Sequence, residues 1–189
     1  MLKIVTITLT LIFSLTFSQA QLLNKLLPPS PFADSLSIVL ESYQQNYRGI
    51  QGIALQPDED RQIFASTVGL PGASSCIIFR FNSRLDTTAG WQATLYEGEN
   101  FKEASKAYKN AIKSIKQTKL TVGISKISFQ GEVVNPSEDL RFTSSIFKPA
   151  EYTDPYKNFM AEVEMLNSME GWVVRLNLHS RRDDTERYQ

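Results

Sequence analysis

Residues 100–119 constrain the fold more than any other stretch of this chain. Their apolar side chains recur at helical spacing, so that one arc of a helix carries all of them: Phe101, Ala104, Tyr108, Ala111, Ile112 and Ile115. Asn100 is a good N-cap residue, and Glu103 stands three positions further on, where a capping-box partner belongs. The sequence therefore predicts an amphipathic helix with one buried face.

The opposite face of this helix carries one kind of charge. We call its five aligned lysines the lysine stripe: Lys102, Lys106, Lys109, Lys113 and Lys116. Exposed helix faces usually mix signs, because like charges four residues apart destabilise a helix by a few tenths of a kcal/mol per pair. The stripe is an ordinary solvated face or a surface that attracts an anionic partner. A third alternative is a contact with the acidic remainder of the same chain or of a second copy.

Charge is unevenly distributed along the chain. The 189 residues include 20 basic and 20 acidic side chains, so the net charge is zero, but residues 101–119 hold six lysines and one glutamate. These residues therefore have a net charge of +5. The rest of the chain has a net charge of −6 when Lys3, which belongs to the expected N-terminal signal peptide, is left out. This balance argues against a nucleic-acid binder, whose domains are usually basic over a whole face. It favours an anionic macromolecule or an acidic envelope protein as partner.

The first 20 residues have the pattern of a secretory signal peptide. Lys3 precedes an apolar run over residues 4–17, and small residues stand before Gln21. The run is shorter than the roughly 20 residues that cross a bilayer, so we expect no transmembrane segment in the mature chain. We expect cleavage near Ala20/Gln21 and export to the periplasm or the extracellular space.

The remaining sequence divides into a Pro-rich spacer at 21–31, a single domain at 32–180 and a polar tail at 181–189. Within the domain, a second amphipathic helix is predicted at 34–48. About seven strands are predicted, at residues 62–68, 75–82, 91–97, 124–134, 140–147, 159–167 and 172–180. The order α-βββ-α-ββββ predicts an α+β fold with a mainly antiparallel sheet and two helices packed on it.

The last two predicted strands can be aligned by their pattern. A turn at 168–171 pairs Asn167 with Trp172 and separates the side chains into two faces. The apolar face holds Phe159, Ala161, Val163, Met165, Val174, Leu176 and Leu178, and the polar face holds Glu162, Glu164, Arg175, Asn177 and His179. This alignment predicts a cross-strand pair between Glu164 and Arg175.

The sequence offers no cofactor fingerprint, metal-ligand cluster or nucleophile–base pair, so we expect no catalytic, cofactor-binding or metal-binding residues. The only histidine, His179, is expected to be exposed and inert, and the only cysteine, Cys76, to be buried and without a disulfide. Glu162 and Glu164 resemble a glycosidase carboxylate pair, but i and i+2 positions of a strand are ordinary neighbours. A deep cleft that joined His179, Glu162 and a second acid would instead favour a hydrolase.

Two further surfaces are candidates for binding. Residues 147–159 are rich in aromatic side chains, as exposed recognition loops are, although such rings also cover the end of a core. We therefore include Tyr152 and Tyr156, together with the lysine stripe, among the candidate contact residues.

The expected function is that of an exported, non-enzymatic binding protein. The alternative is a carrier with an apolar pocket between sheet and helices, lined by Tyr43, Phe79, Trp91 and Tyr108.

Overall fold

The computed structural model of the chain describes residues 32–57, 61–81, 88–151 and 154–180. The chain divides into two units, Met1–Ser30 and Pro31–Gln189, and all described residues belong to the second. The expected signal peptide, spacer and tail lie outside the described residues, as does Tyr152. Among the described helices, none is long and apolar enough to cross a membrane.

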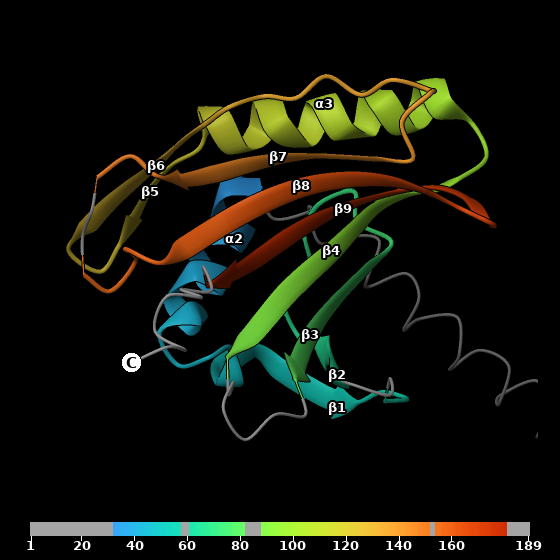
Figure 1. The fold of residues 1–189 in the computed structure, drawn as a ribbon. Coiled ribbons are helices and arrows are strands. Elements are labelled where there is room, and N and C mark those ends of the chain that lie inside the picture. The colour runs from blue at the N-terminus through green and yellow to red at the C-terminus, as the bar shows by residue number, and fades with distance from the viewer. Residues whose placement is uncertain (1–31, 58–60, 82–87, 152–153, 181–189) are drawn as a thin grey trace, which may run out of the picture. The chain divides into compact units, whose positions relative to one another are not determined.

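The described residues form two α-helices, a short 3₁₀ helix and nine strands (Figure 1). In chain order these are α2 (Phe32–Tyr43), η1 (Arg48–Ile50), β1 (Gln51–Ala54), β2 (Arg61–Ser66), β3 (Ser75–Phe81), β4 (Ala89–Gly98), α3 (Phe101–Gln117), β5 (Lys119–Val122), β6 (Ser125–Gly131), β7 (Phe142–Pro149), β8 (Phe159–Ser168) and β9 (Gly171–Ser180). The strands make one sheet in the order β1-β2-β3-β4-β9-β8-β7-β6-β5, and every neighbouring pair is antiparallel. The predicted α+β class is confirmed.

The prediction of about seven strands, in the order α-βββ-α-ββββ, was wrong. Within the described chain there are nine, because β1 and β5 were missed. Each has only four residues, too few for an alternating pattern to stand out from a loop. Strand β5 turns into β6 through Gly123–Ile124 alone, and Gly123 has a φ of 59°, which favours glycine.

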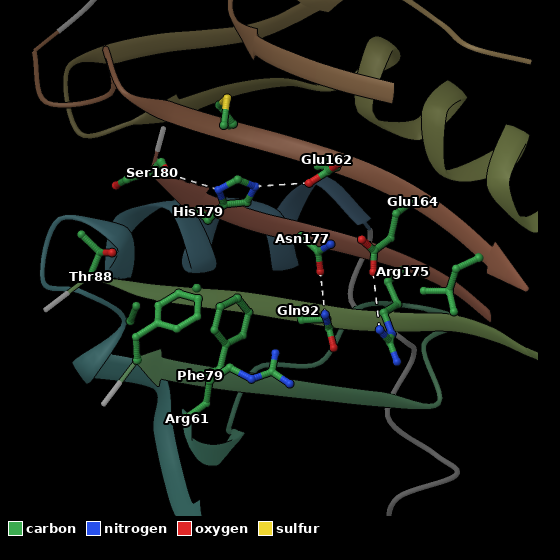
Figure 2. A pocket seen from close by; sticks show the side chains of 15 residues that line it. Arg61, Phe79, Thr88, Gln92, Glu162, Glu164, Arg175, Asn177, His179 and Ser180 are labelled. Carbon is green, nitrogen blue, oxygen red and sulfur yellow. Dashed lines mark hydrogen bonds and ion pairs between the residues drawn. The ribbon is translucent and has the colours of Figure 1, made fainter. Parts of the chain in front are cut away.

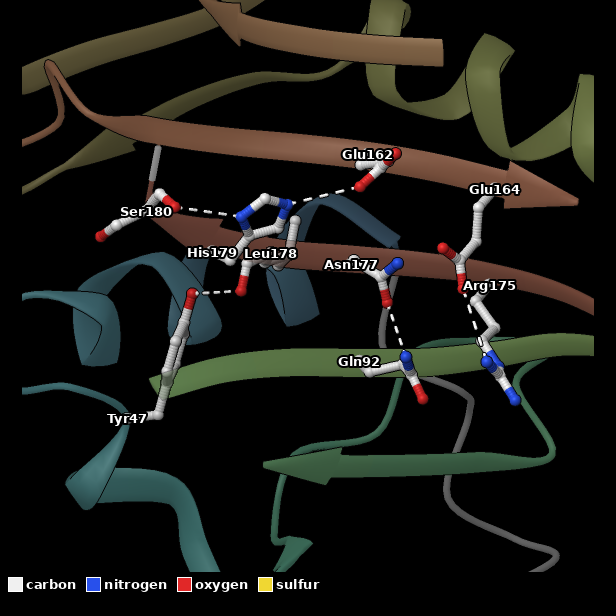
Figure 3. A network of polar contacts seen from close by, with 9 residues as sticks. All are labelled: Tyr47, Gln92, Glu162, Glu164, Arg175, Asn177, Leu178, His179 and Ser180. Atoms are coloured by element: carbon white, nitrogen blue, oxygen red, sulfur yellow. Dashed lines mark hydrogen bonds and ion pairs between the residues drawn. The ribbon is translucent and has the colours of Figure 1, made fainter. Parts of the chain in front are cut away.

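The first helix ends at Tyr43 and does not continue to residue 48 as predicted. The chain turns instead at Asn46 and Tyr47, whose φ angles of 56° and 59° are unfavourable for ordinary side chains. The Tyr47 ring is fully buried, and its hydroxyl donates to the carbonyl of Leu178 at 2.9 Å (Figure 3). This long-range anchor stabilises a turn that helical periodicity does not reveal.

The helix predicted at residues 100–119 is confirmed as α3. The side chain of Asn100 accepts hydrogen bonds from the backbone N–H groups of Lys102 and Glu103, at 2.9 and 3.3 Å, as an N-cap does. The helix lies across β4, β9, β8 and β6, while α2 lies next to β5. Buried side chains of both helices join one core with the inward-facing residues of the sheet.

The predicted alignment of β8 and β9 is also confirmed. Asn167 pairs with Trp172 and Glu164 with Arg175, so the apolar face of this hairpin is buried beneath α3. The polar face points away from the helices. The sheet therefore has a core face and an outer face, and the outer face carries a candidate site.

A long connection between β6 and β7, residues 132–141, runs along α3 (Figure 1). We call it the strap. The Tyr108 hydroxyl of α3 donates to the carbonyl of Val134 in the strap at 3.2 Å and lies 2.7 Å from Ser145 Oγ. Ser145 Oγ in turn accepts from the Val134 N–H at 2.9 Å. These three bonds join the strap to both α3 and β7.

Two candidate binding surfaces

The lysine stripe is exposed along the whole of α3, since all five of its lysines are open to solvent. The strap beside it carries the exposed acids Glu132, Glu138 and Asp139. The ion pairs that join described residues lie elsewhere, in the β8–β9 hairpin, and none reaches the stripe. Repulsion among the five ammonium groups is therefore not offset by a direct ion pair within the described part of the chain.

The stripe is narrow and straight. Its members are separated by four, three, four and three residues. At about 100° and 1.5 Å per residue, this spacing keeps them within an arc of about 80° over a length of about 21 Å. Such a row presents its charges to one side, which suits a flat or linear anionic surface.

Of the two candidate aromatic contact residues, only Tyr156 is described, and it does not share this surface. Tyr156 is fully buried, its ring stacks on Tyr43 at a centroid distance of 6.0 Å, and its hydroxyl accepts from Gln44 Nε2 at 2.7 Å. Tyr156 therefore belongs to the core, and we do not retain it as a contact residue.

The residues expected to line an apolar carrier pocket do not surround a common space. Trp91 and Tyr108 are fully buried, and the Trp91 indole N–H donates to Ser66 Oγ at 2.9 Å. Phe79 lies on the outer face of the sheet, on the side away from the helices. The expectation that these residues line one pocket was wrong, because Phe79 lies on the opposite face of the sheet from the buried Trp91 and Tyr108.

The outer face of β3, β4, β9 and β8 contains a groove of about 640 Å³ (Figure 2). We call it the outer groove. Six polar side chains form its floor: Gln92, Glu162, Glu164, Arg175, Asn177 and His179. Strand pairing places Gln92 opposite Asn177, and Asn177 opposite Glu162, so that one row of polar groups crosses three strands.

One end of the floor is a histidine–carboxylate pair. His179 Nε2 lies 3.5 Å from Glu162 Oε2, and His179 Nδ1 lies 3.1 Å from the carbonyl oxygen of Ser180 (Figure 3). Both ring nitrogens face acceptors, which favours the doubly protonated ring. The hydrogen bond to Glu162 raises the pKa of His179 despite its partial burial, and the same bond lowers the pKa of Glu162.

The other end of the floor is the predicted ion pair. Arg175 Nη1 lies 3.5 Å from Glu164 Oε1, and only 14% of the Glu164 side chain is exposed. The Nε–H of Arg175 is buried and has no acceptor among the described residues. Between the two ion pairs, Gln92 Nε2 donates to Asn177 Oδ1 at 2.8 Å, and Asn177 is almost fully buried.

An aromatic wall borders the floor on the β3 side. The tip of the Phe79 ring lies over Gly90, where an added Cβ would be 2.2 Å from Phe79 Cζ. Phe81 approaches the same ring edge-on, at 5.7 Å between centroids, and the Arg61 guanidinium lies 5.6 Å from its centroid. A glycine inside a strand often marks a close approach of this kind, and here it gives the ring its place.

The outer groove brings together His179, Glu162 and a second acid, Glu164, which is the combination considered above for a hydrolase. A glycosidase, however, uses a carboxylic acid whose pKa is raised. The pKa of Glu162 is lowered, and Glu164 pairs with Arg175. No group of three or more metal-ligating side chains occurs among the described residues. The two carboxylates of the groove therefore do not match the general acid of a glycosidase.

No family model, curated protein or solved structure matches this chain. The alternation in β8 and β9 predicted most of the polar floor, but the groove was missed, because it also needs Gln92 and Phe79 beside that hairpin. Only the pairing of β4 with β9 brings them there, and no short sequence signal encodes it.

The lone cysteine adds no reactive group to either surface. Cys76 is half-buried rather than fully buried as expected, and burial raises the pKa of its thiol. Reactive thiols are those with a lowered pKa in an electropositive setting.

Proposed function

We propose that this chain is an exported binding protein that attaches to an anionic macromolecular surface through the lysine stripe. The observation that carries the proposal is the open row of five lysines without an ion-pair partner among the described residues. A fold that keeps such repulsion on one face gains most when an external anion offsets it. The acidic balance elsewhere in the chain orients the protein with this face toward its partner.

Attachment of this kind is weak per group and sensitive to salt. A lysine near an anionic membrane surface contributes about 1 kcal/mol. Five of them give a dissociation constant in the high micromolar range, on the order of 10⁻⁴ M, which is reversible for one molecule. Because the Debye length is about 8 Å at physiological ionic strength, the attraction acts only at close range.

The test is co-sedimentation of the purified protein with three probes: mixed phosphatidylglycerol–phosphatidylcholine vesicles, phosphatidylcholine vesicles, and polygalacturonate immobilised on beads. The variant replaces Lys106, Lys109 and Lys113 with Gln. A matched control replaces three exposed basic residues outside the stripe, Arg48, Lys126 and Lys157, with Gln. At about 1 kcal/mol per lysine, the stripe variant is expected to bind the anionic probes about 100-fold more weakly.

The control variant is expected to bind as the unmodified protein does, since it loses the same net charge from other places. Equal weakening of the two variants would mean that net charge alone matters, and the stripe proposal would fail. Absence of binding to every anionic probe in low salt would also contradict it.

Export is tested separately by N-terminal sequencing of the protein recovered from its native cells. We expect the sequence to begin at Gln21. A recovered chain that retains Met1 and the apolar run would contradict cleavage at this position.

A further inference from the structure

The outer groove differs from the lysine stripe in that its floor is balanced in charge. Arg175 pairs with Glu164, and His179 with Glu162, each at 3.5 Å. Each charge on the floor therefore already has a counter-ion. A simple anion or cation on the floor would have to break one of these pairs. The other charged side chain that lines the groove, Arg61, places its guanidinium over the Phe79 ring of the wall. The floor itself therefore favours a ligand that is polar but uncharged.

The floor also mixes donors with acceptors at short spacing. The carboxylates and the Gln92 carbonyl accept hydrogen bonds, and beside them the Asn177 amide and the Arg175 guanidinium donate. The Gln92–Asn177 bond uses the Gln92 Nε2 donor and the Asn177 Oδ1 acceptor, so the remaining bonding groups of the two amides are the Gln92 Oε1 acceptor and the Asn177 Nδ2 donor. A hydroxyl group both donates and accepts, so a ligand with several hydroxyls satisfies such a floor without changing its charge.

The wall supplies an apolar contact next to this polar floor. Phe79 and Phe81 line the β3 side, and Met160 and Leu166 line the β8 side. A ligand that fits therefore has C–H surface as well as hydroxyls. The volume of about 640 Å³ lies within the ~300–1,000 Å³ of small-molecule sites.

We propose that the outer groove binds a neutral saccharide, whose hydroxyls bond to the polar floor and whose C–H face contacts the Phe79 wall. The site lies on the sheet face away from α3 and uses uncharged recognition. It is independent of the anionic surface proposed for the lysine stripe, and either proposal can fail without the other.

His179 is the natural reporter for this site because it is the only histidine in the chain and lies on the groove floor. Its ring ¹H and ¹⁵N resonances are unique in an NMR spectrum of the purified protein. The probes are glucose, galactose, mannose, N-acetylglucosamine, cellobiose, maltose and chitobiose, each titrated into the millimolar range. Sodium acetate, arginine and glycylserine serve as charged comparators.

Two variants test the aromatic wall without touching a charged or amide group. Phe79→Leu removes the ring but stays apolar, and Gly90→Ala places a methyl group where the ring tip lies. A third variant, Gln92→Leu, removes the central amide of the floor. The triple Lys→Gln variant of the stripe is the control, since it lies on the helix face.

At least one neutral saccharide is expected to move the His179 resonances along a saturating curve, with the comparators giving none. Phe79→Leu and Gln92→Leu are expected to weaken that binding at least tenfold, Gly90→Ala to weaken it measurably, and the stripe control to leave it unchanged. Thermal unfolding and the ligand-free His179 resonances establish that each variant keeps its fold.

Three outcomes would overturn the proposal. The first is the absence of any His179 shift across the saccharide panel, and the second is a shift given by the charged comparators alone. The third is saccharide binding that persists undiminished in correctly folded Phe79→Leu and Gln92→Leu proteins. None of these results bears on the attachment of the lysine stripe to anionic probes.

Discussion

The exposed face of α3 and the outer face of the sheet differ in whether their charged side chains form ion pairs. On α3, five lysines of one sign stand in the open without a described ion-pair partner. On the outer face, the two acids of β8 each pair with a base of β9, and these side chains are largely shielded. Charge that is paired and shielded contributes to the fold, whereas unpaired like charge weakens it slightly and remains available to a partner.

The largest effect on stability is expected from Glu164→Gln in the outer groove. The substitution removes the carboxylate beside Arg175, whose Nε–H already lacks an acceptor among the described residues. The half-buried guanidinium then has no counter-ion, and the free energy of unfolding is expected to fall by about 1–2 kcal/mol. Urea titration measures this change.

The control for this prediction is Glu170→Gln, the same chemical change at an exposed position in the turn of the same hairpin. We expect it to alter the free energy of unfolding by less than about 0.5 kcal/mol. If both substitutions cost the same, the charge pairing in the groove contributes nothing specific.

A smaller, pH-dependent effect is expected from His179→Gln. The pKa of His179 is raised in the fold, so its contribution is complete below its unfolded value and declines as pH rises through the folded value. The pKa of Glu162 is lowered, so its contribution is complete above its unfolded value and declines as pH falls through the folded value. The pair therefore stabilises the fold most between about pH 4.5 and 6.5.

Unfolding by urea across pH 4–8 is the measurement for this pair. The wild-type advantage over His179→Gln is expected to reach about 0.5–1 kcal/mol inside the window and to decrease on both sides of it. Glu164 and Arg175 face the same groove, so Glu164→Gln in the same titration separates their contribution. An advantage that does not vary with pH would contradict the proposed pairing.

The smallest effect, and one of opposite sign, is expected on the helix face. Replacing Lys106, Lys109 and Lys113 with Gln removes like-charge neighbours at i,i+3 and i,i+4 and keeps good helix formers. The protein is expected to become more stable by a few tenths of a kcal/mol in low salt, and added salt is expected to abolish the gain. Differential scanning calorimetry at two salt concentrations measures it. A clear loss of stability would mean that these lysines are paired after all.

The elements with strong local patterns could be predicted from the sequence. The N-cap at Asn100, the apolar arc of α3 and the alignment of β8 with β9 were all correct, because each depends on residues within about 20 positions. The strands β1 and β5 were missed because each has only four residues. The turn at Asn46–Tyr47 was missed because a distant contact, the Tyr47–Leu178 hydrogen bond, stabilises it.

The two candidate sites also differ in how far they could be predicted from local sequence patterns. The lysine stripe lies on one helix, so helical spacing was enough to align its members, and the structure adds that they are exposed. The outer groove joins β3 and β4 to β8 and β9 through the pairing of β4 with β9. Single-sequence periodicity says nothing about that pairing, so Phe79 was assigned to the wrong side of the sheet.

The salt dependence of binding to phosphatidylglycerol–phosphatidylcholine vesicles tests the central claim most directly. The unmodified protein and the Arg48, Lys126, Lys157→Gln control are expected to bind alike and to lose affinity steeply as salt increases. The Lys106, Lys109, Lys113→Gln variant is expected to bind weakly at low salt, and its affinity is expected to change little as salt increases. The difference in affinity between this variant and the other two proteins is therefore expected to disappear at high salt. Parallel salt curves for all three proteins would contradict the assignment of the lysine stripe as the contact surface.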